Sequence, residues 1–206
     1  FVSSFMAKPF ANQTGNGLHV HCSVLDDKGN NIFDDGTDAG SDLLRYAIGG
    51  LQATLGDAMA LFAPNLNSYR RFGPNLFVPV NRAWGYNNRS VAFRVPAGSP
   101  ESRRIEHRVS GADANPYLVL AAILAGIHHG IVNKIEPDEP AEGNACDVMD
   151  EGIPFYLPSA LKRLRNSDVM REYLGGHYVD VYAETKMLEY DKFQQTISPL
   201  EYDWYL

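Results

Sequence analysis

The chain has 206 residues, of which 45% are hydrophobic and 21% are charged, enough for one globular domain with a sizeable core. Its 25 acidic and 18 basic residues give a formal net charge of -7, which argues against nucleic-acid binding. We find no continuous apolar run long enough to predict a membrane span, and no signal peptide. Cys22 and Cys146 are far apart and fit no metal or redox spacing, which favours a reducing, cytoplasmic location. Because Phe1 opens what resembles the middle of an element, we expect a fragment of a longer protein.

The first predicted element is a strand over residues 18–25. Apolar side chains and Cys22 occupy its even positions, and polar side chains occupy its odd positions, namely His19, His21 and Ser23. This period of two is typical of a strand with one face toward the core. Residues 26–31 then predict a turn, and residues 32–33 a short returning strand.

A long helix is predicted next, beginning at Ser41-Asp42 and ending before Pro64, with apolar residues at helical spacing between them. Residues 64–88 are rich in Asn, Pro, Gly, Tyr and Arg and show no sustained period. An irregular stretch of this length inside a compact domain is usually functional.

The rest of the chain continues with strands and then helices. Strands are expected over residues 90–95 and 103–110, and a largely apolar, buried helix starts near Asn115-Pro116. Residues 134–158 form an acidic, Pro-rich surface loop. Three short helices follow it, at residues 159–166, 167–174 and 179–195. This order predicts an α+β fold in which helices pack on an antiparallel sheet.

His19 and His21 are the first candidate site residues. They lie two apart on the predicted strand, so both side chains point to the same side. The Gly15-Asn16-Gly17 turn before them would let a ligand approach the backbone closely. One imidazole could bind a metal and the other a phosphate. The alternative is two histidines on the wet face of an amphipathic strand.

Arginines are concentrated between positions 70 and 108 although the chain is acidic overall. On the second predicted strand, Arg104, Glu106 and Arg108 share one face. Two guanidinium groups beside a carboxylate keep it ionised, able to hold a divalent cation, while the arginines can neutralise phosphate or carboxylate oxygens. A solvated edge strand with ion pairs, or a positive patch that docks an acidic partner or another subunit, would produce the same pattern.

Five motifs, in order over residues 8–118, resemble those of glutamine synthetases. They are Lys8-Pro9-Phe10 with Gly15 to Ser23, Asn67-Ser68-Tyr69-Arg70-Arg71, Asn88-Arg89-Ser90 with Arg94-Val95-Pro96, Arg103 to Arg108, and Ala114 to Leu118. The resemblance implies the catalytic fold shared with guanido kinases. Residues 1–206 would be the C-terminal portion of that domain, with the active-site sheet and helices in 1–133 and a loop with C-terminal helices in 134–206.

The resemblance also implies roles for matching positions. His19 and Glu106 would ligate Mg²⁺ or Mn²⁺, and His21, Ser23 and Arg104 would line the nucleotide site. Other residues would bind the substrates. Gly15 and Arg71 would bind glutamate, Arg89 and Arg94 would bind the ATP phosphates, and Arg108 would bind the glutamyl phosphate. Arg89 and Arg108 would be catalytic. ATP would phosphorylate the γ-carboxylate of glutamate, and an amine would then displace phosphate. Full-length relatives form ring dodecamers whose sites lie between subunits.

Three positions depart from the family pattern. Phe77 stands where ammonia-using members have a glutamate that binds and deprotonates ammonium, and its apolar side chain favours a larger amine, as in γ-glutamylputrescine synthetases. Glu101 replaces a common nucleotide-contacting Lys, and Thr14 a common Asn.

His19 and Glu106 alone are too few ligands for a tight metal site. The family's paired metal glutamates would lie in the N-terminal half of the protein, so we expect the 206-residue chain itself to be inactive. The alternatives are an ammonia-using glutamine synthetase, a non-catalytic relative kept for assembly, and, more remotely, a phosphagen kinase.

Overall fold

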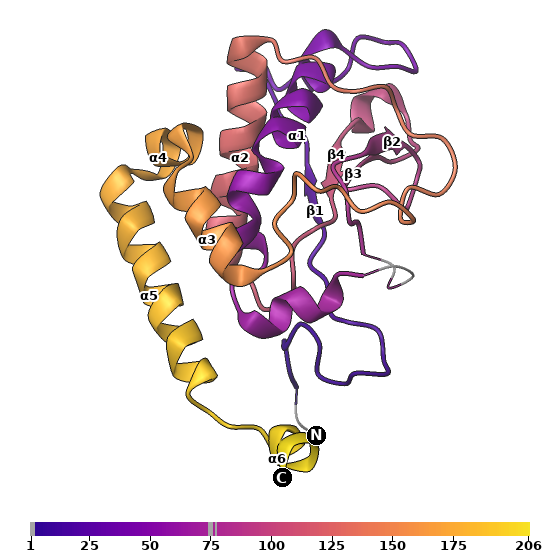
Figure 1. The fold of residues 1–206 in the computed structure, drawn as a ribbon. Coiled ribbons are helices and arrows are strands. Elements are labelled where there is room, and N and C mark those ends of the chain that lie inside the picture. Colours follow the sequence, from indigo (N-terminus) through magenta and orange to yellow (C-terminus); the bar gives the residue numbers. More distant parts are fainter. Residues whose placement is uncertain (1–2, 74–75, 77) are drawn as a thin grey trace.

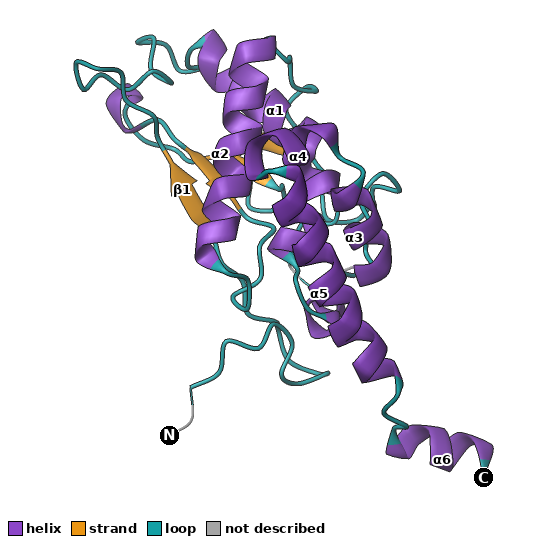
Figure 2. Ribbon diagram, turned by 90° about the vertical axis from the view of Figure 1, so that its left-hand side faces the viewer, coloured by secondary structure: helices purple, strands orange, loops and turns teal. Residues whose placement is uncertain are grey.

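The computed structural model describes residues 3–73, 76 and 78–206. A small sheet is backed by helices, and the C-terminal helices extend away from it (Figures 1 and 2). The predicted α+β class is therefore confirmed.

The sheet has four strands of three residues each, in the order β1-β4-β3-β2. They are β1 (Val20–Cys22), β2 (Trp84–Tyr86), β3 (Phe93–Val95) and β4 (Ile105–His107). β4 pairs antiparallel with β1 and β3, as predicted, whereas β2 pairs parallel with β3. The sheet is thus mixed rather than antiparallel. β2 lies in the stretch predicted to be irregular, since three residues are too few to show a period.

Two long helices form the core against this sheet. α1 (Asp42–Phe62) begins at Ser41, whose side chain accepts a hydrogen bond from the Leu44 amide, and α2 (Pro116–Asn133) begins at Asn115, which caps the Tyr117 amide. The helices cross at glycines: a Cβ atom on Gly50 would collide with the backbone of Gly126 and Gly130. Glycine is unfavourable inside a helix, and this close backbone contact explains its presence.

α2 is only partly buried, which corrects the predicted buried helix. The face toward α1 is covered, but Tyr117, Leu120, Leu124 and Val132 are 42–81% exposed. By length and composition alone α2 could cross a membrane, with 39% of its residues buried in this fold. This is weak evidence for a span, because core helices have the same composition.

The C-terminal part is helical. It contains α3 (Leu157–Arg165), α4 (Asp168–Leu174), α5 (Gly176–Gln194) and α6 (Pro199–Tyr205). Gly175, with φ of 87°, ends α4 and precedes α5, close to the predicted break. α6 was not predicted, and all its residues are exposed. Two 3-10 helices, Leu66–Arg71 and Pro100–Ser102, complete the elements, and the first also lies in the stretch predicted to be irregular.

Candidate active site

The strand register gathers the predicted site residues on one face of the sheet. Glu106 on β4 lies opposite His21 on β1 and opposite Arg94 on β3. Side chains directly across from each other in a sheet are neighbours on the same face. A carboxylate, an imidazole and a guanidinium group from three strands therefore meet at one level.

Glu106 is the centre of this cluster, and its side chain is only 4% exposed. Its Oε1 accepts a hydrogen bond from Arg108 Nη1 at 2.7 Å, and its Oε2 accepts one from Arg94 Nη1 at 3.0 Å. Burial by itself would raise the pKa of Glu106, but the two arginines outweigh it and lower the pKa below its usual value. The carboxylate is therefore ionised at neutral pH.

The two histidines lie on the exposed side of the carboxylate. His19 Nδ1 is 3.1 Å from Glu106 Oε1, and His21 Nε2 is 3.8 Å from the same oxygen. Partial burial and then the positive charge of Arg108 lower the pKa of His19, which favours the neutral imidazole. Arg104 Nε donates to His21 Nδ1 at 3.2 Å and so orients the second ring.

Arg71 lies apart from the carboxylate, beside the Gly15–Gly17 turn. Its side chain is packed so closely that a Cβ atom on Gly15 would be 2.8 Å from Arg71 Cγ, and one on Gly17 would be 3.2 Å from Arg71 Nη2. Arg71 Nη1 donates to the Val109 carbonyl at 3.3 Å, and among the described residues its buried Nε has no partner. The structure thus brings Arg71 and Gly15 together, with Arg71 only 2% exposed.

The remaining predicted residues are distributed around this cluster. Arg89 is exposed, but its backbone carbonyl accepts a hydrogen bond from Arg108 Nη2 at 2.9 Å. Ser23 is exposed just beyond β1. Phe77 lies outside the described residues, so its predicted place beside the amine remains an expectation.

Two features of the site were not predicted from the sequence. Asn87 has a positive φ of 49° and accepts a hydrogen bond from Arg94 Nη2 at 2.6 Å, so it orients one of the two arginines. The Asn87-Asn88 pair, a common turn signal, could have drawn attention to this. His107 projects to the other face of β4, between Phe62 and Phe93, and burial lowers its pKa to about 3.

The described residues do not complete a metal site. Within them no group of three His, Cys, Asp or Glu side chains could hold a metal ion. The carboxylate of Glu106 is shared between two arginines, and only His19 and His21 stand close to it as further donors. Mg²⁺ prefers oxygen ligands and is usually held by one or two carboxylates together with several waters. In the described part of the chain the one carboxylate of the cluster is already paired with two arginines, so these residues alone do not fit the ion.

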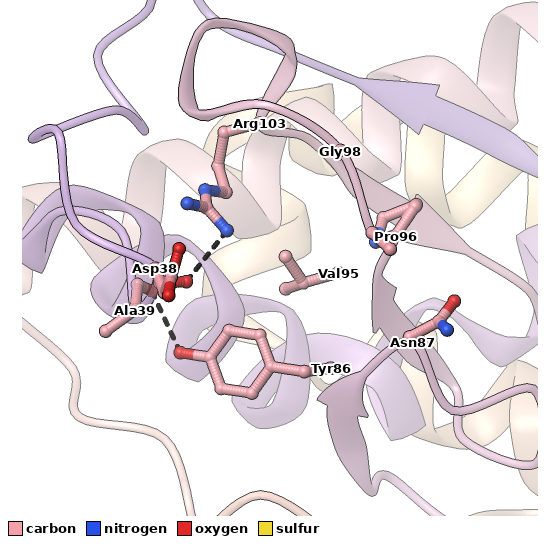
Figure 3. A pocket seen from close by; sticks show the side chains of 9 residues that line it. Asp38, Ala39, Tyr86, Asn87, Val95, Pro96, Gly98 and Arg103 are labelled. Carbon is pink, nitrogen blue, oxygen red and sulfur yellow. Dashed lines mark hydrogen bonds between the residues drawn. The ribbon is translucent and has the colours of Figure 1, made fainter.

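A separate cavity of about 470 Å³ lies at the C-terminal end of β3. Arg103 and Tyr86 line it, and they hold the backbone of residues 37–39 through hydrogen bonds to the carbonyls of Asp38 and Ala39 (Figure 3). Among the predicted site residues, none lines it. Asn87 lies between this cavity and Arg94.

A carboxylate held ionised between two arginines, on a small sheet backed by helices, is the kind of site that handles anionic groups such as phosphate. The sequence profile described as "Glutamine synthetase, catalytic domain" matches residues 1–205. The chain therefore belongs to the glutamine synthetase family, as its motifs indicated.

Individual relatives agree with this assignment. Gamma-glutamylputrescine synthetase PuuA of Escherichia coli is 43% identical over 99% of this chain and 43% of its own length. Gamma-glutamylethanolamide synthetase GlnA4 of Streptomyces coelicolor is 36% identical over 98% of this chain and 42% of its own length. A solved structure described as a GmaS/ADP complex superposes with a TM-score of 0.85 at 28% identity, covering 98% of this chain and 48% of that one. The chain thus spans less than half the length of these relatives.

Proposed function

We propose that the protein containing this chain joins the γ-carboxylate of glutamate to an amine larger than ammonia, using ATP. The observation that carries the proposal is the Glu106 cluster, in which Arg94 and Arg108 are held 3.0 and 2.7 Å from one ionised carboxylate. The family membership and the two γ-glutamylamide synthetases among the relatives support it.

The reaction has two steps. A γ-carboxylate oxygen of glutamate attacks the γ-phosphorus of ATP, which forms γ-glutamyl phosphate and releases ADP. The neutral amine then attacks the acyl carbon, and phosphate leaves as the amide forms and the amine loses a proton. Fixed cations beside the transferred group stabilise its charge without reorganising during the reaction.

The residues of this chain divide between the two substrates. Arg89, which is exposed, and Arg94 would contact the ATP phosphates, and Arg108 would contact the glutamyl phosphate. Gly15 and Arg71 would hold glutamate, since they pack against each other and the neighbouring Gly17 lies close to the His19 ring. His21, Ser23 and Arg104 would line the nucleotide site. A related solved structure is described as a GmaS/ADP complex, which supports nucleotide binding by the family fold.

His19 and Glu106 would contribute to a cation site whose other ligands come from the N-terminal half of the protein. The described residues of this chain supply too few donors to hold the ion by themselves. By family resemblance the full-length protein would be a ring dodecamer.

The amine is tested by assaying the full-length protein with glutamate, ATP and Mg²⁺ against putrescine, ethanolamine, isopropylamine and ammonium. We expect kcat/KM to be highest for an alkyl amine, because the Phe77 side chain is apolar and carries no charge that could bind ammonium. A preference for ammonium would instead favour an ordinary glutamine synthetase, the second candidate, which the family name itself supports.

A further inference from the structure

The loop that follows α2 is bound to the β2 edge of the sheet. Figure 1 shows the chain after α2 passing around the end of the sheet where β2 lies. The Ala141 amide donates to the Trp84 carbonyl at 2.7 Å, and the Trp84 indole donates to the Asp138 carbonyl at 2.6 Å. Further along, the Asp150 amide donates to the Val80 carbonyl at 2.9 Å. We call residues 138–150 the edge segment.

Asn88 joins the edge segment to the turn that carries Arg89. Its Nδ2 donates to the carbonyls of Ala141 and Gly143 at 3.1 and 2.8 Å. Its Oδ1 accepts hydrogen bonds from the Ser90 amide and hydroxyl at 2.9 and 2.6 Å. Both ends of the side-chain amide are therefore used, one to attach the turn and the other to close it.

The closed turn acts on the cluster through the backbone of Arg89. The Arg89 carbonyl accepts a hydrogen bond from Arg108 Nη2 at 2.9 Å, while Arg108 Nη1 is bound to Glu106 at 2.7 Å. These two acceptors fix the plane of the Arg108 guanidinium group. A shift of the turn would displace one of them and would also move the exposed Arg89 side chain.

We propose that Asn88 is a positioning residue, which acts through the Arg89 carbonyl to hold Arg108 in place for phosphoryl transfer. This inference rests on the proposed function. Among the described residues, Asn88 makes no hydrogen bond to Glu106, Arg94 or Arg108, so its effect would be transmitted by the turn.

Asn81 provides a matched control on the same edge segment. Its Nδ2 donates to the carbonyls of Ala145 and Val148, and its Oδ1 accepts from the Ala83 amide at 3.0 Å. It makes the same kinds of bond as Asn88, but its local bond closes a turn that does not contain Arg89. Asn81→Ala therefore loosens the edge segment without releasing Arg108.

The test compares Asn88→Ala and Asn81→Ala in the full-length enzyme, by steady-state kinetics with the best amine and by thermal unfolding. We expect similar losses in Tm. For Asn88→Ala we expect kcat to fall about ten- to a hundred-fold, because small displacements of catalytic groups have effects of this size, with little change in the KM for the amine. For Asn81→Ala we expect kcat to stay within about threefold.

Ser90→Ala is the second variant if Asn88→Ala does not fold, and its kcat should fall while its fold is retained. Equal kcat losses for the two asparagine variants, or an unchanged kcat in Asn88→Ala or in a folded Ser90→Ala, would overturn the positioning role alone. A wild-type enzyme that is inactive with every amine would overturn the proposed function, and the positioning role with it.

Discussion

At the scale of single residues, Glu106 shows why a buried charge can be stable and useful at once. A lone carboxylate at 4% exposure would be strongly disfavoured, but Arg94 and Arg108 compensate it. The same arrangement holds two guanidinium groups beside one face of the sheet. Under the proposed function, a phosphoryl group would replace part of their interaction with the carboxylate.

Glu106→Gln should destabilise the fold and not only the reaction. The substitution keeps the shape but removes the negative charge between two largely buried arginines, so we expect a loss of about 2–4 kcal/mol. Urea unfolding at pH 7 measures it. Glu101→Gln, at an exposed glutamate, is the control and should change stability by less than about 0.5 kcal/mol. Equal stability of the two variants would contradict this view of the cluster.

His107 is the opposite case, a buried polar ring without compensation. Among the described residues neither ring nitrogen has a hydrogen-bond partner, and the ring lies 4.5 Å from that of Phe62. His107→Leu should therefore be neutral or stabilising by about 1 kcal/mol at pH 7, since it removes unsatisfied polar atoms. A loss above 2 kcal/mol in urea unfolding would show that the ring has a partner.

At the scale of elements, helices are joined by close backbone contact and by a few polar links. Gly50→Ala would place a methyl group against the backbone of α2, which cannot yield as a side chain can. We expect a loss above about 3 kcal/mol. For Gly56→Ala in the same helix, the three nearest atoms belong to the guanidinium end of Arg163, which can shift more easily than backbone, so this variant should cost clearly less. Chemical denaturation of both variants measures their losses in unfolding free energy. Similar losses would contradict the close backbone contact at Gly50.

Asp57 connects α1 to the C-terminal helices. Its carboxylate accepts from Arg163 Nε on α3 and from the Ser167 hydroxyl, both at 2.7 Å. Because the pair is only partly buried, we expect Asp57→Ala to cost about 1–2 kcal/mol. Glu184→Ala, which breaks the exposed pair with Arg165, should cost less than about 0.5 kcal/mol. Equal urea midpoints for Asp57→Ala and the unmodified protein would contradict this role.

The two long helices α1 and α2 and the site face were predictable for a shared reason. Caps such as Ser41 and Asn115, and the alternation of Arg104, Glu106 and Arg108, are local signals. β2 was not predictable, because a strand of three residues shows no period. The attachment of the Asn88 turn was not predictable either, because its partners, the carbonyls of Ala141 and Gly143, lie about fifty residues further on. A sequence pattern cannot show which distant backbone carbonyls a side-chain amide will reach.

At the scale of the whole molecule, the described residues bring two arginines, two histidines and one carboxylate together but do not complete a cation site. We expect the isolated 206-residue chain to release no phosphate from ATP above background in the presence of glutamate and an amine. Steady phosphate release by the purified chain, measured in a coupled assay, would contradict this expectation.

The proposed function depends on the formation of γ-glutamyl phosphate. Glutamate carrying ¹⁸O in its γ-carboxylate should be given to the full-length enzyme with ATP and the preferred amine, and the released phosphate analysed by mass spectrometry. Because the bridging oxygen of an acyl phosphate leaves with phosphorus, our account predicts one ¹⁸O atom in each phosphate formed. Amide formation with unlabelled phosphate would contradict it.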